Sequence, residues 1–340
     1  NKSNQDFVNS LYIVALQRKC DERELLHYCN LLDSNSKNRL EITNIIFTSE
    51  ECKRIYSNQK LKYLVRKEFD YPELGTISPK DIKIPLFADP LVTVLIPHYC
   101  KVEYTLNCLK SISDFLPTIT FEVLVLDDLS PDSSLKILKK VKNIRVIQNP
   151  TNLGFTKSCN YGSTFAKGQY LFFLNSDTQV KEGWLDALID TFRLFPKCGI
   201  AGSKLLYPDG RLQEAGCIIW QGEAIWNYGR DDDPNRPEYN YLREVDYCSG
   251  AAILIKKDLF LELGCFDEQY APAYCEDTDL CLAVRSAGYS VIYQPFSEIV
   301  HYEGISNGTD VKSGIKAYQD INIKKLYAKW EKVINSHGEC

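Results

Sequence analysis

The stretch YLFFLNSDTQV, residues 170–180, joins an apolar run with strong strand character to a small polar cluster. Asn175, Ser176 and Asp177 end the run, and residues of these types commonly stop strands and begin turns. A carboxylate at the carboxyl end of a parallel strand also lies where open α/β sheets bind their ligands. Both interpretations fit the stretch alone, so the sequence around it has to decide between them.

The surrounding sequence alternates between apolar runs and helical patterns. Strands are predicted at 91–96, 121–126, 144–149 and 170–174, with helical segments between them. Continuous apolar strands that alternate with helices predict an α/β fold, with parallel strands and both faces of the sheet covered. The alternation weakens after Pro196, where strands are predicted at 245–255 and 290–295 and a long polar and aromatic loop at 220–245.

The flanking segments complete the predicted domain organisation. Residues 1–68 show apolar side chains at helical spacing and predict a small helical domain. Residues 69–90 hold four prolines without periodicity and predict a linker, because proline disfavours both helix and central strand. The α/β domain then spans 91–311. An amphipathic helix within 312–340 is expected to pack on it with its lysines in solvent, and peripheral contact with an anionic membrane is the alternative.

The composition is that of an ordinary globular protein, with 44% hydrophobic and 25% charged residues among 340. A net charge of −5 argues against a nucleic-acid partner, and no apolar run is long enough to span a bilayer. The 13 cysteines include no C-x-x-C pair, so we expect buried thiols in the cytoplasm or at the inner face of the membrane. The chain does not begin with methionine, which leads us to expect further domains of a longer polypeptide.

Four polar clusters lie at or near the ends of predicted elements. Each one alone is typical of a cap or a turn, because acidic residues complement helix starts. Together they lie where ligands of one α/β sheet would converge. The last member follows a segment with little regular pattern. The clusters are Asp127–Asp128, Asn175–Ser176–Asp177, Glu276–Asp277 and His301.

These residue types suit one kind of chemistry. Asp177 and His301 could hold a divalent metal that neutralises a diphosphate. A separate carboxylate such as Asp277 could deprotonate a hydroxyl nucleophile. Asp127 or Asp128 could accept a hydrogen bond from the imide N–H of uracil or thymine.

Residues 91–310 resemble the family 2 glycosyltransferases. That resemblance implies the GT-A fold, a Rossmann-like mixed, mostly parallel sheet flanked by helices. Within the family, the pattern is closest to bacterial O-antigen and surface-polysaccharide transferases such as rhamnosyltransferases. The N-terminal stretch DFVNSLYIVALQRKCDERELLHYCNLL resembles a small helical domain of unassigned function in bacterial surface proteins. The family resemblance is carried by VTVLIPHY, EVLVLDDLSPDSS, NPTNLGFTKSCNYG, YLFFLNSDTQV, VDYCSGAAILIKKDLF, LGCFDEQYAPAYCEDTDLCLAVRSAGY and VHYEG, in the family's order.

The resemblance implies a role for each cluster. Residues 175–177 match the family's D-x-D motif for metal and diphosphate, and His301 matches a histidine that joins the metal in some members. Asp277 matches the general base, with Glu276 beside it. Asn175 replaces the first aspartate and supplies no full negative charge, which leaves the cofactor open between Mn²⁺ and Mg²⁺.

Two binding surfaces are also implied. Asp127 matches the aspartate that contacts the nucleotide base and Tyr99 the aromatic residue beside it, although His98 and Cys100 depart from the family's common Tyr-Asn pair. The residues expected to bind the nucleotide sugar are Pro97, Tyr99, Asp127, Asp128, Asn152, Asn175 and Asp177. Those expected to bind the acceptor are Trp226, Tyr228 and Gly250.

Together these expectations predict an inverting glycosyltransferase that acts in bacterial surface-polysaccharide synthesis. It would move a sugar from a UDP or dTDP donor to a hydroxyl of a saccharide or lipid-linked saccharide, without a covalent intermediate. A non-catalytic nucleotide-sugar-binding module of a larger assembly is one alternative, and the presence of both Asp177 and Asp277 speaks against it. A nucleotidyltransferase is disfavoured because PHYCKVEY, residues 97–104, has no glycine with which to bind a triphosphate.

Overall fold

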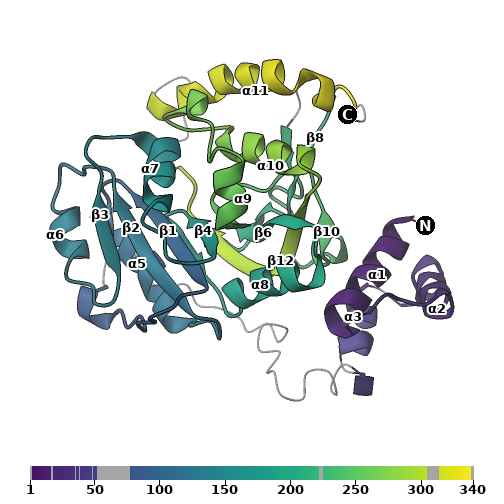
Figure 1. The fold of residues 1–340 in the computed structure, drawn as a ribbon. Helices are drawn as coiled ribbons and strands as arrows, with labels where there is room; N and C mark the ends of the chain where they lie inside the picture. Colours follow the sequence, from purple (N-terminus) through teal and green to yellow (C-terminus); the bar gives the residue numbers. More distant parts are fainter. Residues whose placement is uncertain are drawn as a thin grey trace.

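A computed structural model describes residues 2–16, 18–34, 36–37, 39–47, 49–51, 77–221, 225–304 and 314–337. Its centre is a mixed sheet with the strand order β10-β12-β6-β11-β4-β1-β2-β3 (Figure 1). The strands β3, β2, β1 and β4 are parallel, β11 runs against β4 and β6, and β12 runs parallel to β6. The bounds are β1 Val92–His98, β2 Phe121–Asp127, β3 Arg145–Gln148, β4 Tyr170–Leu174, β6 Cys198–Leu206, β10 Arg243–Glu244, β11 Ala252–Lys256 and β12 Ser290–His301.

Short strands extend this sheet at the ends of β6 and β12. β5 pairs with the end of β12, and β7 pairs with the end of β6. A separate hairpin joins β8 to β9. The bounds are β5 Thr178–Val180, β7 Leu212–Glu214, β8 Cys217–Ile219 and β9 Ile225–Asn227.

Helices cover both faces of the sheet. α5 Val102–Asp114, α6 Ser134–Leu138 and α8 Trp184–Leu194 contribute to the core on one face. α7 Gly154–Ser163, α9 Lys257–Glu262 and α10 Glu276–Ser286 contribute to the other, as does α11 Tyr318–Ile334. Alternate residues of β1 enter the two cores, since Val94 and Ile96 lie in one and Leu95 in the other. This arrangement confirms the predicted doubly covered α/β sheet.

Strand β12 differs from its prediction. The strand expected at 290–295 continues to His301, so His301 ends a regular strand and does not follow an irregular segment. Pro295 cannot donate to the ladder. The register with β6 shifts between Gln294 and Glu298, after which pairing resumes. A bulge therefore accommodates the proline without ending the strand.

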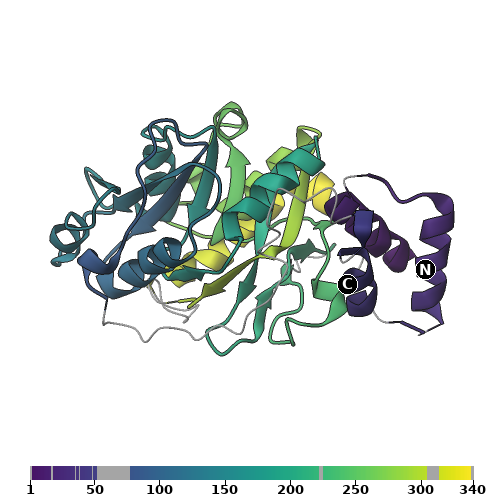
Figure 2. The ribbon, with the colours of Figure 1, turned by 90° about the horizontal axis from the view of Figure 1, so that it is seen from below.

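The N-terminal helices form a small domain of their own. They are α1 Lys2–Leu16, α2 Glu22–Asp33 and α3 Arg39–Phe47, and their core includes Phe7, Leu11 and Ile42. Figures 1 and 2 place them beyond the β10 end of the sheet. The contact involves Tyr241, whose ring lies 5.6 Å from that of Phe7. The prediction of a small all-α domain before the sheet is confirmed.

Part of the segment predicted as a linker packs against the sheet domain. Ile82 and Ile84 are buried in the core beside α5, after the short helix η2 at Pro79–Asp81. The Lys83 amide donates to Ser113 Oγ at 2.8 Å, and Asn143 Nδ2 donates to the Ile84 carbonyl at 2.8 Å. Residues 69–76 of the predicted linker lie outside the described residues.

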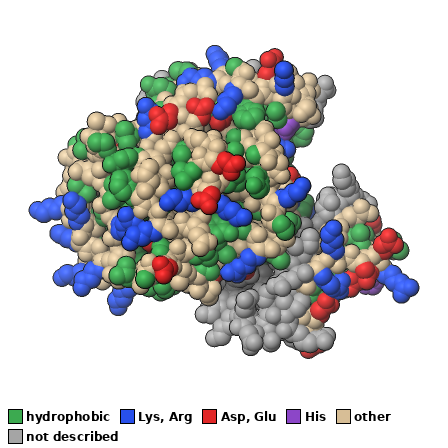
Figure 3. All heavy atoms as spheres, viewed as in Figure 1, with side chains coloured by type: hydrophobic (Ala, Val, Ile, Leu, Met, Phe, Trp, Pro, Cys, Tyr) green, Lys and Arg blue, Asp and Glu red, His purple; other side chains and the backbone are tan. Residues whose placement is uncertain are grey.

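Helix α11 lies across the α10 side of the molecule (Figure 1). Leu326 and Ile334 are buried in the core there. Its outer surface carries lysines interspersed with Asp320 and Glu331, and Figure 3 shows both signs of charge mixed on that face. Within the described ranges, no helix is both long and apolar enough to cross a membrane.

Candidate active site

The carboxyl ends of β1, β2 and β4 meet at one edge of the sheet. β1 pairs in parallel with both neighbours, and its last residue, His98, lies beside Asp127 at the end of β2. Asn175 follows directly after β4. The structure therefore brings two of the predicted clusters to the edge where α/β sheets bind ligands.

Asp127 and His98 hold buried polar atoms that lack a partner. Asp127 is fully buried, and its Oδ2 accepts a hydrogen bond from Gln148 Nε2 at 3.2 Å. Asp127 Oδ1 and His98 Nε2 are buried without a hydrogen-bond partner among the described residues. His98 Nδ1 lies 2.7 Å from Thr105 Oγ1, and burial lowers the pKa of the imidazole. Because an unsatisfied buried polar atom costs free energy, a ligand that donates to Asp127 Oδ1 fits here.

Asp128, the next residue, is fully engaged. Its carboxylate accepts hydrogen bonds from Asn149 Nδ2 at 2.8 Å, from the Leu153 amide at 2.7 Å and from the Gly154 amide at 2.9 Å. These bonds fix the start of α7. A Cβ on Gly154, which has a φ of +72°, would lie 2.7 Å from Pro272 Cβ, so only glycine fits this contact. Asp128 thus fixes the start of α7 beside the strand ends, with both of its carboxylate oxygens hydrogen-bonded.

The remaining residues of the predicted nucleotide set lie at the same edge. Tyr99 follows β1 and is 40% exposed. Asn152 is exposed, and its Nδ2 donates to the Asp128 carbonyl at 3.3 Å. Pro97 lies within β1 and is partly buried. Tyr99 and Asn152 are therefore exposed at this edge, whereas Pro97 lies within the strand.

Asn175, Asp177 and His301 form the second group. His301 Nε2 lies 3.4 Å from Asp177 Oδ1 and 3.3 Å from Asn175 Nδ2. Asn175 Oδ1 is buried and makes no hydrogen bond within the described ranges. Carboxylate, amide oxygen and imidazole are ligands that suit Mn²⁺ and, for the oxygens, Mg²⁺. In the described part of the chain, no three His, Cys, Asp or Glu side chains cluster for a metal, so a metal held here would need an oxygen such as that of Asn175 beside Asp177 and His301.

His301 is held in place by its other ring nitrogen. Nδ1 lies 2.8 Å from Gln213 Oε1, on β7. Burial disfavours a charged imidazole, but the carboxylates of Asp177 and Glu303 outweigh it and raise the pKa of His301. The site around His301 therefore favours a cation, whether a proton or a metal.

A three-residue segment, Ser249–Ala251, connects this group to the predicted base. The Gly250 amide donates to Asp277 Oδ2 at 2.8 Å, and the Asn175 amide donates to the Ala251 carbonyl at 2.9 Å. A Cβ on Gly250 would lie 3.1 Å from Asp277 Cβ, so glycine allows this close approach. The structure thus joins the Asn175 and Asp277 clusters, which are 102 residues apart (277 − 175), through consecutive backbone groups.

Asp277 lies in the first turn of α10, and both of its carboxylate oxygens accept hydrogen bonds from backbone amides. Oδ1 accepts from the Thr278 amide at 2.7 Å, and Oδ2 accepts from Gly250. Burial raises the pKa of Asp277, against the effect of these donors. Glu276 points elsewhere, since its Oε2 lies 3.5 Å from Thr156 Oγ1 on α7, and burial and the neighbouring carboxylate raise its pKa well above the ordinary value. Of the two carboxylates, that of Asp277 is the one bound by Gly250, and that of Glu276 faces α7.

Glu214 is a member of the site that the sequence did not reveal. It is buried at the end of β7, and its Oε1 accepts from the Ser249 amide at 3.0 Å, next to the amide that binds Asp277. Burial raises the pKa of Glu214 to about 7. The sequence offered only the run Gln213-Glu214 in a turn-rich region as a signal, because its partners are distant along the chain.

The predicted acceptor residues have different surroundings. Trp226, on β9, is 53% exposed and stands near Trp220, with 6.2 Å between ring centroids. Tyr228 is covered by the Arg243 guanidinium, 4.3 Å from its ring centroid, and by Tyr239. Trp226 is therefore largely exposed, whereas Tyr228 packs against Arg243 and Tyr239 within the loop.

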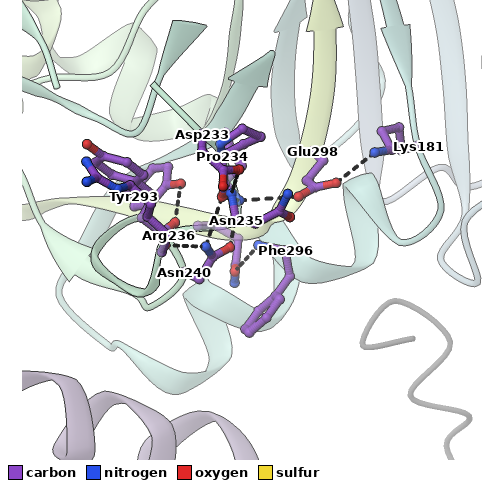
Figure 4. Close-up of polar contacts among 12 residues, drawn as sticks. Lys181, Asp233, Pro234, Asn235, Arg236, Asn240, Tyr293, Phe296 and Glu298 are labelled. Atoms are coloured by element: carbon purple, nitrogen blue, oxygen red, sulfur yellow. Dashed lines mark hydrogen bonds and ion pairs between the residues drawn. The ribbon is translucent and has the colours of Figure 1, made fainter. Parts of the chain in front are cut away.

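The loop that follows is fixed by a buried lysine. Lys204 Nζ donates to the Pro234 carbonyl at 3.0 Å and to Asn240 Oδ1 at 2.7 Å, and it lies 3.3 Å from Glu298 Oε1. Figure 4 shows Glu298 between this loop and Lys181. These contacts attach Pro234 and Asn240 of the loop to β6 and β12, so this part of the loop packs as part of the domain.

The profile of the family described as Glycosyl transferase family 2 matches residues 93–263. This chain belongs to glycosyltransferase family 2. Residues 1–56 match a domain of unknown function, DUF4214. The resemblance seen in the sequence is therefore confirmed for both parts of the chain.

Relatives include bacterial proteins of glycan synthesis. "O-antigen biosynthesis protein RfbC" of Myxococcus xanthus is 24% identical over 67% of this chain and 18% of its own length. "N-acetylglucosaminyl-diphospho-decaprenol L-rhamnosyltransferase" of Mycobacterium tuberculosis is 27% identical over 58% of this chain and 71% of its own. "Uncharacterized protein y4gI" of Sinorhizobium fredii is 27% identical over 73% of this chain. The chain spans only 28% of y4gI and 18% of RfbC.

A solved structure shows the same fold. GalNAc-T7, crystallised with UDP, GalNAc and Mn²⁺, superposes with a TM-score of 0.58 at 16% identity, over 72% of this chain and 48% of that one. The predicted GT-A fold is therefore confirmed.

Proposed function

We propose that this family 2 glycosyltransferase is an inverting, metal-dependent enzyme that uses a UDP or dTDP sugar. The observation that carries the proposal is the segment Ser249–Ala251, which holds Asp277 on one side and Asn175 on the other. This segment would hold a base for the acceptor hydroxyl next to a site for the diphosphate. That arrangement suits displacement of the diphosphate from the anomeric carbon by the acceptor oxygen.

The donor would bind along the strand ends. Asp127 Oδ1, buried and without a partner in the described chain, can accept the imide N–H of uracil or thymine. Tyr99, which directly follows the end of β1, would stack on the base, and Asp128 would position the surrounding loop. A divalent metal, Mn²⁺ or Mg²⁺, held by Asp177, His301 and Asn175 would supply neutralisation of the diphosphate charge.

The transfer itself would use Asp277. Its carboxylate takes the proton of the acceptor hydroxyl while that oxygen attacks the anomeric carbon. The bond from this carbon to the diphosphate oxygen breaks, and the nucleoside diphosphate leaves with the bonding electrons. Attack from the opposite face inverts the anomeric centre. The raised pKa of Asp277 makes it a stronger base than an exposed carboxylate.

The acceptor is proposed to be a saccharide or a lipid-linked saccharide of a bacterial surface polysaccharide. The names of RfbC and of the mycobacterial rhamnosyltransferase support this class of product. Trp226 and the Gly250 region would meet the acceptor. Such a substrate places the enzyme in the cytoplasm, at the inner face of the membrane.

The test is release of nucleoside diphosphate from a panel of UDP and dTDP sugars, with Mn²⁺ or Mg²⁺ and saccharide acceptors. We expect turnover with one donor class and its loss with EDTA. Donor binding without transfer or hydrolysis would favour a non-catalytic sugar-nucleotide-binding module. Activity unaffected by EDTA would overturn the assignment of the metal.

A further inference from the structure

Asn322 on α11 is fully buried and faces the segment that leads to the predicted base. Its Nδ2 lies 2.7 Å from the Tyr270 carbonyl, 2.9 Å from that of Ala273 and 3.1 Å from that of Tyr274. One amide group has two N–H donors, so three carbonyls share them. A single side chain therefore binds three backbone carbonyls of the segment 270–274.

That segment has a backbone that needs such support. Tyr274 and Cys275 have φ values of 79° and 72°, in the left-handed region that non-glycine residues rarely adopt. Residues in this region persist where the surrounding structure fixes them, and they cluster at functional sites. Cys275 immediately precedes Glu276 and Asp277 at the start of α10. The position of Asp277 therefore depends on the contacts that hold 270–275.

Other residues of the C-terminal region reinforce the same segment. Lys325 Nζ donates to the Gln269 carbonyl at 2.6 Å and to Asn322 Oδ1 at 3.0 Å. Lys316 Nζ lies 4.5 Å from the ring centroid of Tyr274. Helix α11 thus holds the backbone of this segment, and Lys316, just before that helix, contacts the side chain of Tyr274.

Helix α11 also contacts α10 just beyond the base. Trp330 Nε1 donates to Asp279 Oδ1 at 2.7 Å, and Lys329 Nζ lies 2.8 Å from the same oxygen. Tyr270 Oη donates to Asp279 Oδ1 at 3.0 Å. Contacts from one helix therefore lie on both sides of Asp277 in the sequence.

We propose that Asn322, on α11, is a positioning residue for Asp277. The inference rests on the proposed function, because it assigns Asn322 an effect through the base. The matched family region ends at 263, so neither α10 nor α11 lies within it. Asn322 itself bonds to the segment 270–274, and that segment reaches the nucleotide side through Pro272, whose carbonyl accepts from the Thr156 amide at 3.3 Å. Loss of Asn322 should therefore lower kcat far more than it changes donor binding.

The experiment compares Asn322→Ala with Ile334→Ala in the full chain. Ile334 is buried on the same helix, in the same core, so its truncation tests loss of packing alone. We expect Asn322→Ala to lower kcat roughly 10- to 100-fold, with donor KM within about 2-fold. Amide hydrogen exchange within 271–279 should accelerate about 10-fold or more, while β1 is unchanged. Ile334→Ala should lower Tm similarly and leave kcat within about 2-fold.

A double-mutant cycle with Asp277→Asn distinguishes the role of Asn322 as a positioning residue from the role of Asp277 as the base. If Asn322 acts through Asp277, Asn322→Ala costs little further activity in the Asp277→Asn background. Additive losses, equal kcat losses in Asn322→Ala and Ile334→Ala, or a changed donor KM would overturn the inference. Normal turnover of Asp277→Asn would instead overturn the base assignment in the proposed function. Lys325→Met, a milder change, should lower kcat by about 3-fold and serves if Asn322→Ala does not fold.

Discussion

At the ends of β1, β2 and β4, buried atoms of Asp127, His98 and Asn175 have no partner in the described chain. Around Asp277, by contrast, both carboxylate oxygens accept hydrogen bonds from backbone amides. The first region is left with unsatisfied groups that a donor and a metal would satisfy. The second is preorganised, because its geometry is fixed before any substrate arrives. Substitutions in the two regions should therefore have different kinetic consequences.

The largest effect is expected at the preorganised region. Asp277→Asn keeps the shape of the side chain and removes the proton acceptor. We expect turnover to fall by roughly 10²-fold or more, the scale of a lost general base. Steady-state assays of nucleoside diphosphate release measure this change. Exposed Asp320→Asn is the control and should behave as wild type. Near-normal turnover of Asp277→Asn would direct attention to Glu276.

A somewhat smaller loss is expected at the metal ligands. Asp177→Ala removes the one carboxylate of the proposed ligand set, leaving an imidazole and an amide oxygen. The Mn²⁺ concentration for half-maximal activity should rise about 10-fold or more, with turnover falling in parallel. His301→Ala should act in the same direction more mildly. An unchanged Mn²⁺ requirement in both variants would exclude these residues as ligands.

Asp127→Ala tests the nucleotide end of the site separately from the base. The loss of an acceptor for the imide N–H should weaken UDP binding about 10-fold, the usual scale for a hydrogen bond to a charged group. Discrimination between UDP and CDP should fall as well, while kcat changes little. Competition of the two nucleotides against the donor measures both values. Unchanged discrimination between UDP and CDP would show that another group recognises the nucleotide base.

The smallest effect concerns Glu214 and pH. Because its folded pKa, about 7, exceeds the ordinary value of 4.5, the folded state binds this proton more tightly than the unfolded state. The resulting stability is present below about pH 4.5 and is lost as the pH rises through 7. The Tm of Glu214→Gln minus the Tm of wild type should therefore be about 3 °C higher at pH 8 than at pH 5.

Scanning calorimetry of metal-free protein at both values of pH tests this expectation. Glu262→Gln, on the exposed side of α9, is the matched control and should follow wild type at both. A Tm difference for Glu214→Gln that is the same at pH 5 and pH 8 would contradict the assigned titration.

The strand ends were predictable because they depend on local patterns. Apolar runs that stop at Asp127 and Asn175 place both residues from periodicity and turn chemistry alone. Asp277 and His301 were singled out as polar residues near the ends of predicted elements, and the family resemblance then assigned their roles. The sequence pattern did not extend β12 to His301, because Pro295 interrupts a strand whose pairing is decided by distant β6 and β5.

The residues that hold the site could not be predicted in this way. Glu214 acquires its role from the Ser249 amide, and Asn322 from carbonyls about 50 residues earlier in the chain. Ile82 and Ile84 have the alternating spacing of a packed extended segment, but the prolines around them dominated the pattern. Long-range backbone partners leave no periodic signal.

The most direct test of the contrast between the two regions is a calorimetric titration of UDP and dTDP, with Mn²⁺, into wild type, Asp177→Ala and Asp277→Asn. If donor binding belongs to the strand ends and catalysis to the preorganised base, Asp277→Asn binds the nucleotide as wild type does. Asp177→Ala then binds it at least about 10-fold more weakly. Equal weakening in both variants, or weakening in Asp277→Asn alone, would contradict that division.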